Sequence, residues 1–88
     1  MSRKVTFVET GWTDYTSWLA DDRRILGKIN RLINDVVRNG QSEGTGKPEP
    51  LRANLAGYWS RRIDQEHRLV YRATDDEVVI IACRGHYE

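Results

Sequence analysis

The sequence predicts an α+β domain in which a two-helix hairpin packs on one face of a mostly antiparallel sheet, in the order β-α-α-β-β-β. Three observations predict this class: a β-forming segment near the start, two helical stripes between positions 12 and 37, and three strand-like segments after position 57. The 88 residues suit one domain, residues 1–88. Hydrophobic residues make up 39% and charged residues 31% of the chain, which favours a folded globule over a disordered segment.

The first two expected elements are a strand and a helix. Residues 4–9 are rich in valine and phenylalanine, which favour strands, and Gly11 is expected to break the strand. A helical stripe follows at positions i, i+3, i+6 and i+7, formed by Trp12, Tyr15, Trp18 and Leu19. We expect Thr10 or Thr13 to cap this helix and both tryptophans to lie in the core.

A second helix is predicted directly after the first. Its apolar face consists of Ile25, Ile29, Leu32, Ile33 and Val36. Asp21 or Asp22 is the expected N-cap, and Asn39-Gly40 is a stop signal because glycine tolerates the left-handed conformation that ends helices. The connection between the helices is so short that they should form an antiparallel hairpin.

A long irregular segment, residues 40–57, separates the helices from three further strands. Its glycines and prolines exclude regular structure, and a loop of this length inside a compact domain is often functional. The strands are predicted at residues 58–64, 67–74 and 77–83, joined by short polar turns as in hairpins. The last strand is apolar at consecutive positions, so we expect it to be central and covered on both faces.

Composition limits the function classes. The net charge of +1 does not by itself mark a nucleic-acid binder, and Cys83 is the only cysteine, which excludes an intrachain disulfide and suits a reducing compartment. Cys83 continues an apolar strand and is expected to be a small buried hydrophobe. No segment has the length of a secretory leader or membrane span, so we expect a cytoplasmic protein. Metal-ligand spacings and glycine-rich phosphate loops are lacking, and no cofactor is expected.

The charge is unevenly placed. Between positions 47 and 72 there are six cations against three carboxylates. The cations are Lys47, Arg52, Arg61, Arg62, Arg68 and Arg72. On a two-residue period, Arg62 and Arg68 can converge on the open face of the sheet if the register of their strands matches. Charge alone favours the alternative that these are solvated or ion-paired strand arginines.

Two further segments carry candidate chemistry. Glu49 lies between Pro48 and Pro50, whose rings stiffen the backbone, so its carboxylate could act as a general base or be an ordinary surface glutamate. His86-Tyr87 follow the last strand, where histidine suits proton transfer near neutral pH and tyrosine suits stacking or phosphate binding, unless they form a frayed tail. His67 opens a strand beside a polar turn and is expected to be structural.

The combined motifs resemble the YoeB toxin family of the RelE/ParE toxin–antitoxin superfamily. The resemblance runs from about Val5 to Tyr87. It is carried by Gly46-Lys47-Pro48-Glu49-Pro50-Leu51, Gly57-Tyr58-Trp59-Ser60-Arg61-Arg62-Ile63, Glu66-His67-Arg68-Leu69-Val70-Tyr71 and Ala82-Cys83-Arg84 with His86-Tyr87. The resemblance implies a RelE-like fold and an endoribonuclease that cleaves messenger RNA in the ribosomal A site. It also implies a homodimer and a cognate antitoxin protein that blocks the toxin.

The resemblance also implies roles for single residues. Glu49 would be the general base, His86 the general acid, and Arg68 the cation that steadies the phosphate. The expected supporting residues are Lys47, Arg52, Arg62 and Tyr87. The chain departs from the family pattern at Arg52, where lysine is common, at Gly85, where an aromatic often stands, and at an added Glu88. Gly85 is expected to loosen the tail.

Two rival functions remain at the level of sequence. One is a superfamily relative without nuclease activity that binds a protein target such as gyrase. The other is a plain RNA-binding module, which would bind RNA without cutting it. Glu49, Arg68 and His86 together argue against the first of these rivals, and a cleavage assay on ribosomes separates the second.

Overall fold

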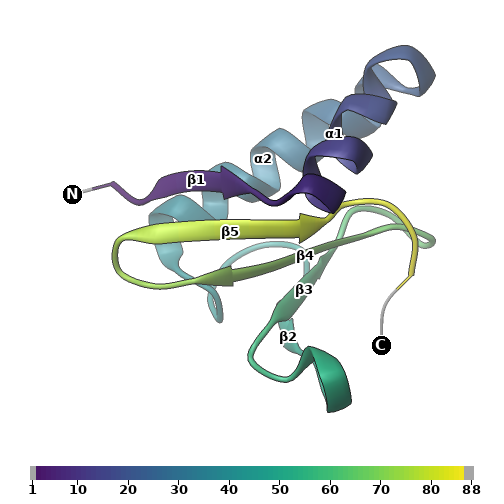
Figure 1. Ribbon diagram of the computed structural model, residues 1–88. Helices are drawn as coiled ribbons and strands as arrows, with labels where there is room; N and C mark the ends of the chain where they lie inside the picture. The colour runs from purple at the N-terminus through teal and green to yellow at the C-terminus, as the bar shows by residue number, and fades with distance from the viewer. Residues whose placement is uncertain (1, 87–88) are drawn as a thin grey trace.

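The computed structural model describes residues 2–86 and confirms the predicted α+β class (Figure 1). Two helices cover one face of a five-stranded sheet. The elements are β1 (Lys4–Phe7), α1 (Glu9–Asp21), α2 (Arg23–Asn39), β2 (Glu49–Pro50), a 3-10 turn (Ala53–Leu55), β3 (Trp59–Arg62), β4 (Arg68–Ala73) and β5 (Glu77–Ala82). Neither helix has the length and apolarity that a membrane crossing needs within these residues.

The sheet has the strand order β1-β5-β4-β3-β2. β1 runs parallel to β5 and every other pair is antiparallel, so the sheet is mostly antiparallel, as predicted. β5 is an interior strand, as expected, although β4 is the middle one of the five. β2 is an addition to the predicted order, because the segment expected to be wholly irregular supplies a two-residue edge strand.

The main core lies between the helices and the sheet. Ile29 and Val36 of α2 are fully buried against Leu69, Tyr71 and other residues of the sheet. A smaller cluster of Leu51, Val70 and Ala82 covers part of the opposite face. Cys83 is buried as predicted, and burial, helped by the nearby Asp14 carboxylate, raises the pKa of its thiol to about 12. The helices therefore occupy one face, and the other face stays open beyond the small cluster.

The helix boundaries correct two predictions and confirm two. α1 begins at Glu9, so the expected caps at Thr10 and Thr13 are wrong, and Gly11 lies inside the helix rather than ending a strand. For α2, the Asp22 carboxylate accepts hydrogen bonds from the main-chain N–H groups of Arg24 and Ile25 at 3.0 and 3.4 Å. Gly40 ends α2 with a positive φ of 86°, which glycine adopts readily, so the predicted glycine stop is confirmed.

Trp12 corrects the expected core. Trp18 is buried as predicted, but Trp12 is 54% exposed. The ring of Trp12 packs 5.6 Å from Phe7 and 5.9 Å from Tyr15, so the three aromatics form a surface cluster at the junction of β1 and α1. The early start of α1 rotates Trp12 away from the sheet and points Gly11 toward it.

Gly11→Ala is expected to destabilise the fold by about 1–3 kcal/mol, because overpacking at a rigid contact outweighs the better helix propensity of alanine. An added Cβ would stand 2.4 Å from the main-chain oxygen of Ile80 and 3.0 Å from its carbonyl carbon, so β5 or α1 would have to shift. Urea denaturation at constant pH measures the change.

Gly27→Ala is the matched control on the neighbouring helix. A Cβ there meets only the end of the flexible Arg31 side chain, at 3.7 Å. This variant should gain stability, by up to about 1 kcal/mol, from helix propensity alone. Equal stability changes in the two variants would contradict the close approach of α1 to β5.

Candidate active site

A pocket of about 520 Å³ lies on the open face of the sheet, opposite the helices, where β2, β3, β4 and the C-terminal segment meet. It is lined by Lys47, Glu49, Pro50, Leu51, Arg52, Ser60, Arg62, Arg68 and His86. Six of the seven residues predicted for the site are therefore brought together. The seventh, Tyr87, lies outside the described residues.

Strand register places the two central arginines. Arg62 of β3 pairs directly with Arg68 of β4, so both side chains leave the sheet on the same face, as predicted. Glu49 of β2 pairs with Ser60 on the other side of β3. Ser60 precedes Arg62 by two positions and therefore shares its face. The short β2 thus carries a carboxylate to the edge of a pocket whose floor is basic.

The backbone around Glu49 is held firmly. The main-chain N–H of Leu51 donates to the carbonyl of Tyr58 at 2.9 Å, and the N–H of Arg62 donates to the carbonyl of Gly46 at 2.7 Å. Between these bonds Lys47 adopts φ of 54°, a left-handed conformation that costs a residue with a side chain of order 1 kcal/mol and that the surrounding hydrogen bonds hold in place. The exposed Glu49 carboxylate therefore projects from a stiff edge.

The side chain of Arg68, the first residue of β4, is held by hydrogen bonds to the β3–β4 turn. Its side chain is 9% exposed, and its Nη1 donates to the carbonyls of Asp64 and His67 at 2.7 and 3.1 Å. The Asp64 carboxylate in turn accepts the main-chain N–H groups of Glu66 and His67. Burial alone would raise the pKa of Asp64, but these hydrogen bonds outweigh it and hold that pKa below its usual value. The guanidinium is thus oriented before any ligand arrives.

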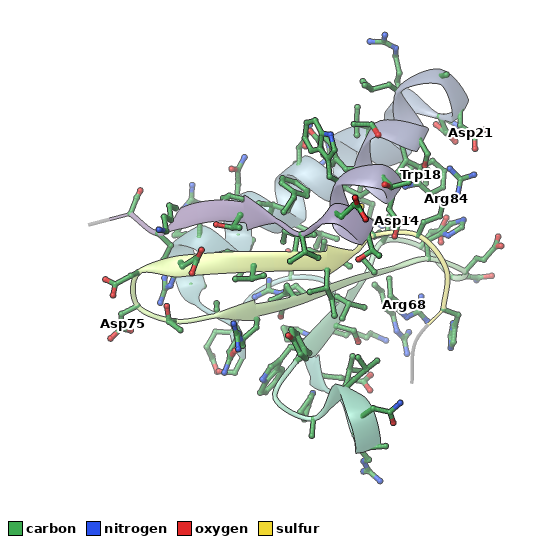
Figure 2. All side chains as sticks on the ribbon, viewed as in Figure 1. Asp14, Trp18, Asp21, Arg68, Asp75 and Arg84 are labelled. Carbon is green, nitrogen blue, oxygen red and sulfur yellow. The ribbon has the colours of Figure 1, made fainter. Side chains whose placement is uncertain are left out.

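The segment before His86 is anchored at two successive residues. The guanidinium of Arg84 stacks 4.0 Å above the Trp18 ring and pairs with Asp21 of α1, and Figure 2 shows these three side chains together beside α1. Gly85 donates its N–H to Nδ1 of His67 at 2.9 Å and accepts the N–H of Arg68 at 2.9 Å. Gly85 was expected to loosen the tail, but its main chain is hydrogen-bonded on both sides.

Arg61 corrects the charge count made from the sequence. It is fully buried on the helix side of the sheet, forms an ion pair with Asp35, and donates to the carbonyls of Gly40, Glu43 and Thr45. It therefore contributes nothing to the open basic face. Arg72 also lies outside the pocket, with its guanidinium 5.6 Å from the centre of the Tyr58 ring. The segment predicted to be structureless is in fact tied to the core by Arg61.

The residues described here contain no group of three or more histidine, cysteine or carboxylate side chains arranged to hold a metal ion. What the pocket does offer is a carboxylate, an imidazole and several guanidinium and ammonium groups. Such a set can move protons and stabilise a developing negative charge on a phosphate.

Comparison with known proteins identifies the family. Residues 7–87 match the family of YoeB-like toxins of bacterial type II toxin–antitoxin systems. The chain belongs to this YoeB toxin family. The toxin YoeB of Escherichia coli K12 is 56% identical over 84 residues, which cover 96% of this chain and 99% of that protein. The YoeB toxin of Streptomyces coelicolor is 54% identical over the same shares of the two chains.

Solved structures of YoeB toxins share the fold. The YoeB dimer from Staphylococcus aureus is similar with a TM-score of 0.90 and 45% identity, covering 97% of this chain and 98% of that one. A YoeB–YefM complex from the same organism matches with a TM-score of 0.88 and 44% identity over the same shares. YafQ from E. coli, at 20% identity and a TM-score of 0.77, shares the fold alone.

Proposed function

We propose that this YoeB-family toxin is a ribosome-dependent endoribonuclease that cleaves messenger RNA in the ribosomal A site and so inhibits translation. One observation carries the proposal: Glu49, Arg68 and His86 line the same pocket although they come from three separate parts of the chain. A base, an acid and a fixed cation are the three groups that metal-free RNA cleavage requires. The compartment proposed for this activity is the cytoplasm.

In the proposed mechanism Glu49 removes the proton of a ribose 2′-hydroxyl. The 2′-oxygen attacks the adjacent phosphorus, and the bond from phosphorus to the 5′-oxygen breaks. His86, in its protonated form, gives its proton to that leaving oxygen. The products are a 2′,3′-cyclic phosphate and a 5′-hydroxyl. Glu49 and His86 exchange protonation states in the reaction and are restored through solvent.

The cations have separate roles in this proposal. Arg68 stabilises the negative charge that builds up on the phosphate oxygens during attack, because its guanidinium is nearly buried and already oriented. Within residues 2–86 only Nη1 of the Arg68 side chain donates a hydrogen bond, so the Nε and Nη2 hydrogens can be donated to a phosphate. Lys47, Arg52 and Arg62 bind the RNA backbone, and Tyr87 supports the same site.

We propose two protein partners, a second copy of the chain and a cognate antitoxin. Two relatives support this: a YoeB toxin solved as a dimer and one solved in complex with YefM. The antitoxin should cover Arg62 and Arg68 through an acidic segment or displace the tail at His86 and Tyr87.

The test is cleavage of a messenger on translating ribosomes, followed by mapping of the 5′ ends. The expected result is new 5′-hydroxyl ends at the A-site codon. Intact messenger together with inhibited gyrase would favour the non-nuclease relative. A gel shift without cleavage would favour a plain RNA-binding module.

Arg68→Ala is expected to slow the chemical step on the order of 10²-fold and to weaken ribosome binding only modestly, because the transition state carries more charge than the substrate. Single-turnover cleavage over a range of toxin concentrations separates the two effects. Arg72→Ala removes the same charge from the same strand outside the pocket and serves as the control. Equal losses in the two variants would show that Arg68 contributes general electrostatics only.

A further inference from the structure

A second hollow of about 590 Å³ adjoins the active-site pocket. It lies between α2 and the segment that leads to β2, and it shares Lys47 and Arg62 with the pocket. It is lined by Lys28, Arg31, Leu32, Asp35, Thr45, Gly46, Lys47 and Arg62. We call this hollow the α2 groove. Because Lys47 and Arg62 line both hollows, the pocket and the groove are adjacent.

The α2 groove is strongly basic. Four cations line it, and the one carboxylate among them is already engaged. Asp35 pairs with Arg61 and accepts the N–H of Thr45 at 3.0 Å and the side-chain amide of Asn39 at 2.9 Å. Burial alone would raise the pKa of Asp35, but these partners hold it below its usual value. The negative charge of Asp35 is therefore balanced by Arg61, and the four cations that line the groove are not paired with it.

We propose that the α2 groove binds phosphates of the messenger strand next to the cleaved nucleotide. This inference rests on the proposed function, because the strand held in the pocket has to continue beyond it. Lys47 and Arg62 would lead the backbone over the edge of the sheet. Lys28 and Arg31 lie three positions apart on α2, on the same face of the helix, and would hold the following phosphates.

The test uses fluorescence anisotropy with RNAs of three and nine nucleotides, each with a 2′-deoxy sugar at the cleavage position. In the double variant Lys28→Gln/Arg31→Gln, binding of the longer RNA should fall about tenfold or more. The slope of log affinity against log salt should become shallower by about 1.4, since each lost contact to single-stranded RNA contributes about 0.7. Binding of the shorter RNA should not change. Arg38→Gln removes a charge from the same helix outside the groove and should leave all values unchanged.

Other outcomes overturn the proposal. An unchanged salt slope for the longer RNA would show that the groove does not hold the strand. Loss of affinity for an acidic antitoxin peptide, with RNA binding intact, would make the groove a protein-docking site. The ribosome cleavage assay is independent of these measurements. If the unaltered chain failed to cleave but showed the length-dependent RNA binding, the proposed function would fall and the groove would stand.

A different observation carries a second inference, which concerns His67. Its Nδ1 accepts the main-chain N–H of Gly85 at 2.9 Å. The ring packs edge-on against Trp18 with 4.8 Å between ring centres, and Nε2 lies 3.7 Å from the Glu66 carboxylate. His67 was expected to be structural, and these contacts show that it connects the main chain at Gly85 to the core at Trp18.

We infer that His67 is a positioning residue for His86. Gly85 is the residue directly before the proposed general acid. Its N–H donates to the His67 ring, and its carbonyl accepts the main-chain N–H of Arg68. The two anchors are consecutive residues, His67 just before β4 and Arg68 at its first position. The main chain next to His86 and the guanidinium of Arg68 are therefore positioned by the same two residues, His67 and Arg68. Loss of the His67 acceptor should misplace His86 and slow protonation of the leaving group.

Three substitutions separate this role from simple packing. In asparagine the amide oxygen takes about the place of Nδ1, whereas in glutamine it lies nearer Nε2, and phenylalanine keeps the ring but has no acceptor. Single-turnover cleavage should fall about tenfold in His67→Phe and His67→Gln, and His67→Asn should recover most of the rate. Thermal unfolding of each variant checks that it is folded.

Epistasis decides whether His67 acts through His86. In a chain that already carries His86→Gln, adding His67→Phe should cost less than twofold, because the acid that it positions is gone. The same tenfold loss in both backgrounds would overturn the inference. So would a His67→Asn variant as slow as His67→Phe while folded to the same extent.

Discussion

Glu49→Gln is expected to lower single-turnover cleavage of ribosome-bound messenger by about 10²-fold or more while binding holds or tightens. Glutamine keeps the shape of the side chain but cannot take the 2′-hydroxyl proton. The substitution also removes a negative charge from a pocket lined by Arg62, Arg68 and other cations, so the RNA phosphates meet less repulsion. Saturating toxin isolates the chemical step, and titration of the toxin gives the binding constant.

His86→Gln provides the companion measurement. It removes the proposed proton donor, leaves a polar side chain, and should lower the same rate by a similar factor. The double variant should be far less affected than the product of the two factors, because a base and an acid that act in one step are not additive. If both single variants cleave at the unaltered rate under saturation, the acid–base assignment is wrong, and the reacting groups have to be sought among the arginines and Tyr87.

The sequence placed the residues that line the pocket more accurately than it placed several details of the fold. Glu49, Arg62 and Arg68 could be placed because the side-chain alternation of strands is strict and because proline fixes the backbone beside Glu49. Hairpins with short turns left little freedom in the register of β3 and β4. The place of His86 in the pocket could be predicted from the resemblance alone. The hydrogen bonds that hold the preceding Gly85 connect it to His67 and Arg68, which are too distant in sequence for a local pattern to reveal.

The failures have a common physical cause. Trp12, Gly11 and Arg61 were each assigned from residue type, whereas tertiary contacts decided their environments. The Cβ-free surface of Gly11 lets α1 approach the main chain of β5, which turns Trp12 outward. Strand alternation puts Arg61 on the face opposite Arg62, but arginine is rarely buried, so its residue type argued against a place in the core. Only the ring of acceptors that converge on it, most of them from residues 40–45, explains its burial.

Arg61→Met is expected to destabilise the fold by about 3–5 kcal/mol, since removal of one partner leaves a charge and several acceptors without their donor. The guanidinium binds the Asp35 carboxylate, the Tyr71 hydroxyl and three main-chain carbonyls, and it is fully buried. A domain of this size has a total stability of roughly 5–15 kcal/mol, so the variant should unfold at much lower urea concentration. Hydrogen exchange of residues 40–46 should become fast even under native conditions.

Arg62→Met is the matched control, because it removes the same group from the next position, where the side chain faces the open pocket. Its stability should change by no more than about 0.5 kcal/mol, whereas its RNA binding should weaken. Tyr71→Phe tests the network even if Arg61→Met does not fold. The Tyr71 hydroxyl accepts from Arg61 Nε at 2.9 Å and donates to the Gln41 carbonyl at 2.6 Å, so its loss should cost about 1–3 kcal/mol. Equal stability of the Arg61 and Arg62 variants would contradict the conclusion that Arg61 organises the loop on which Lys47 and Glu49 are presented to the pocket.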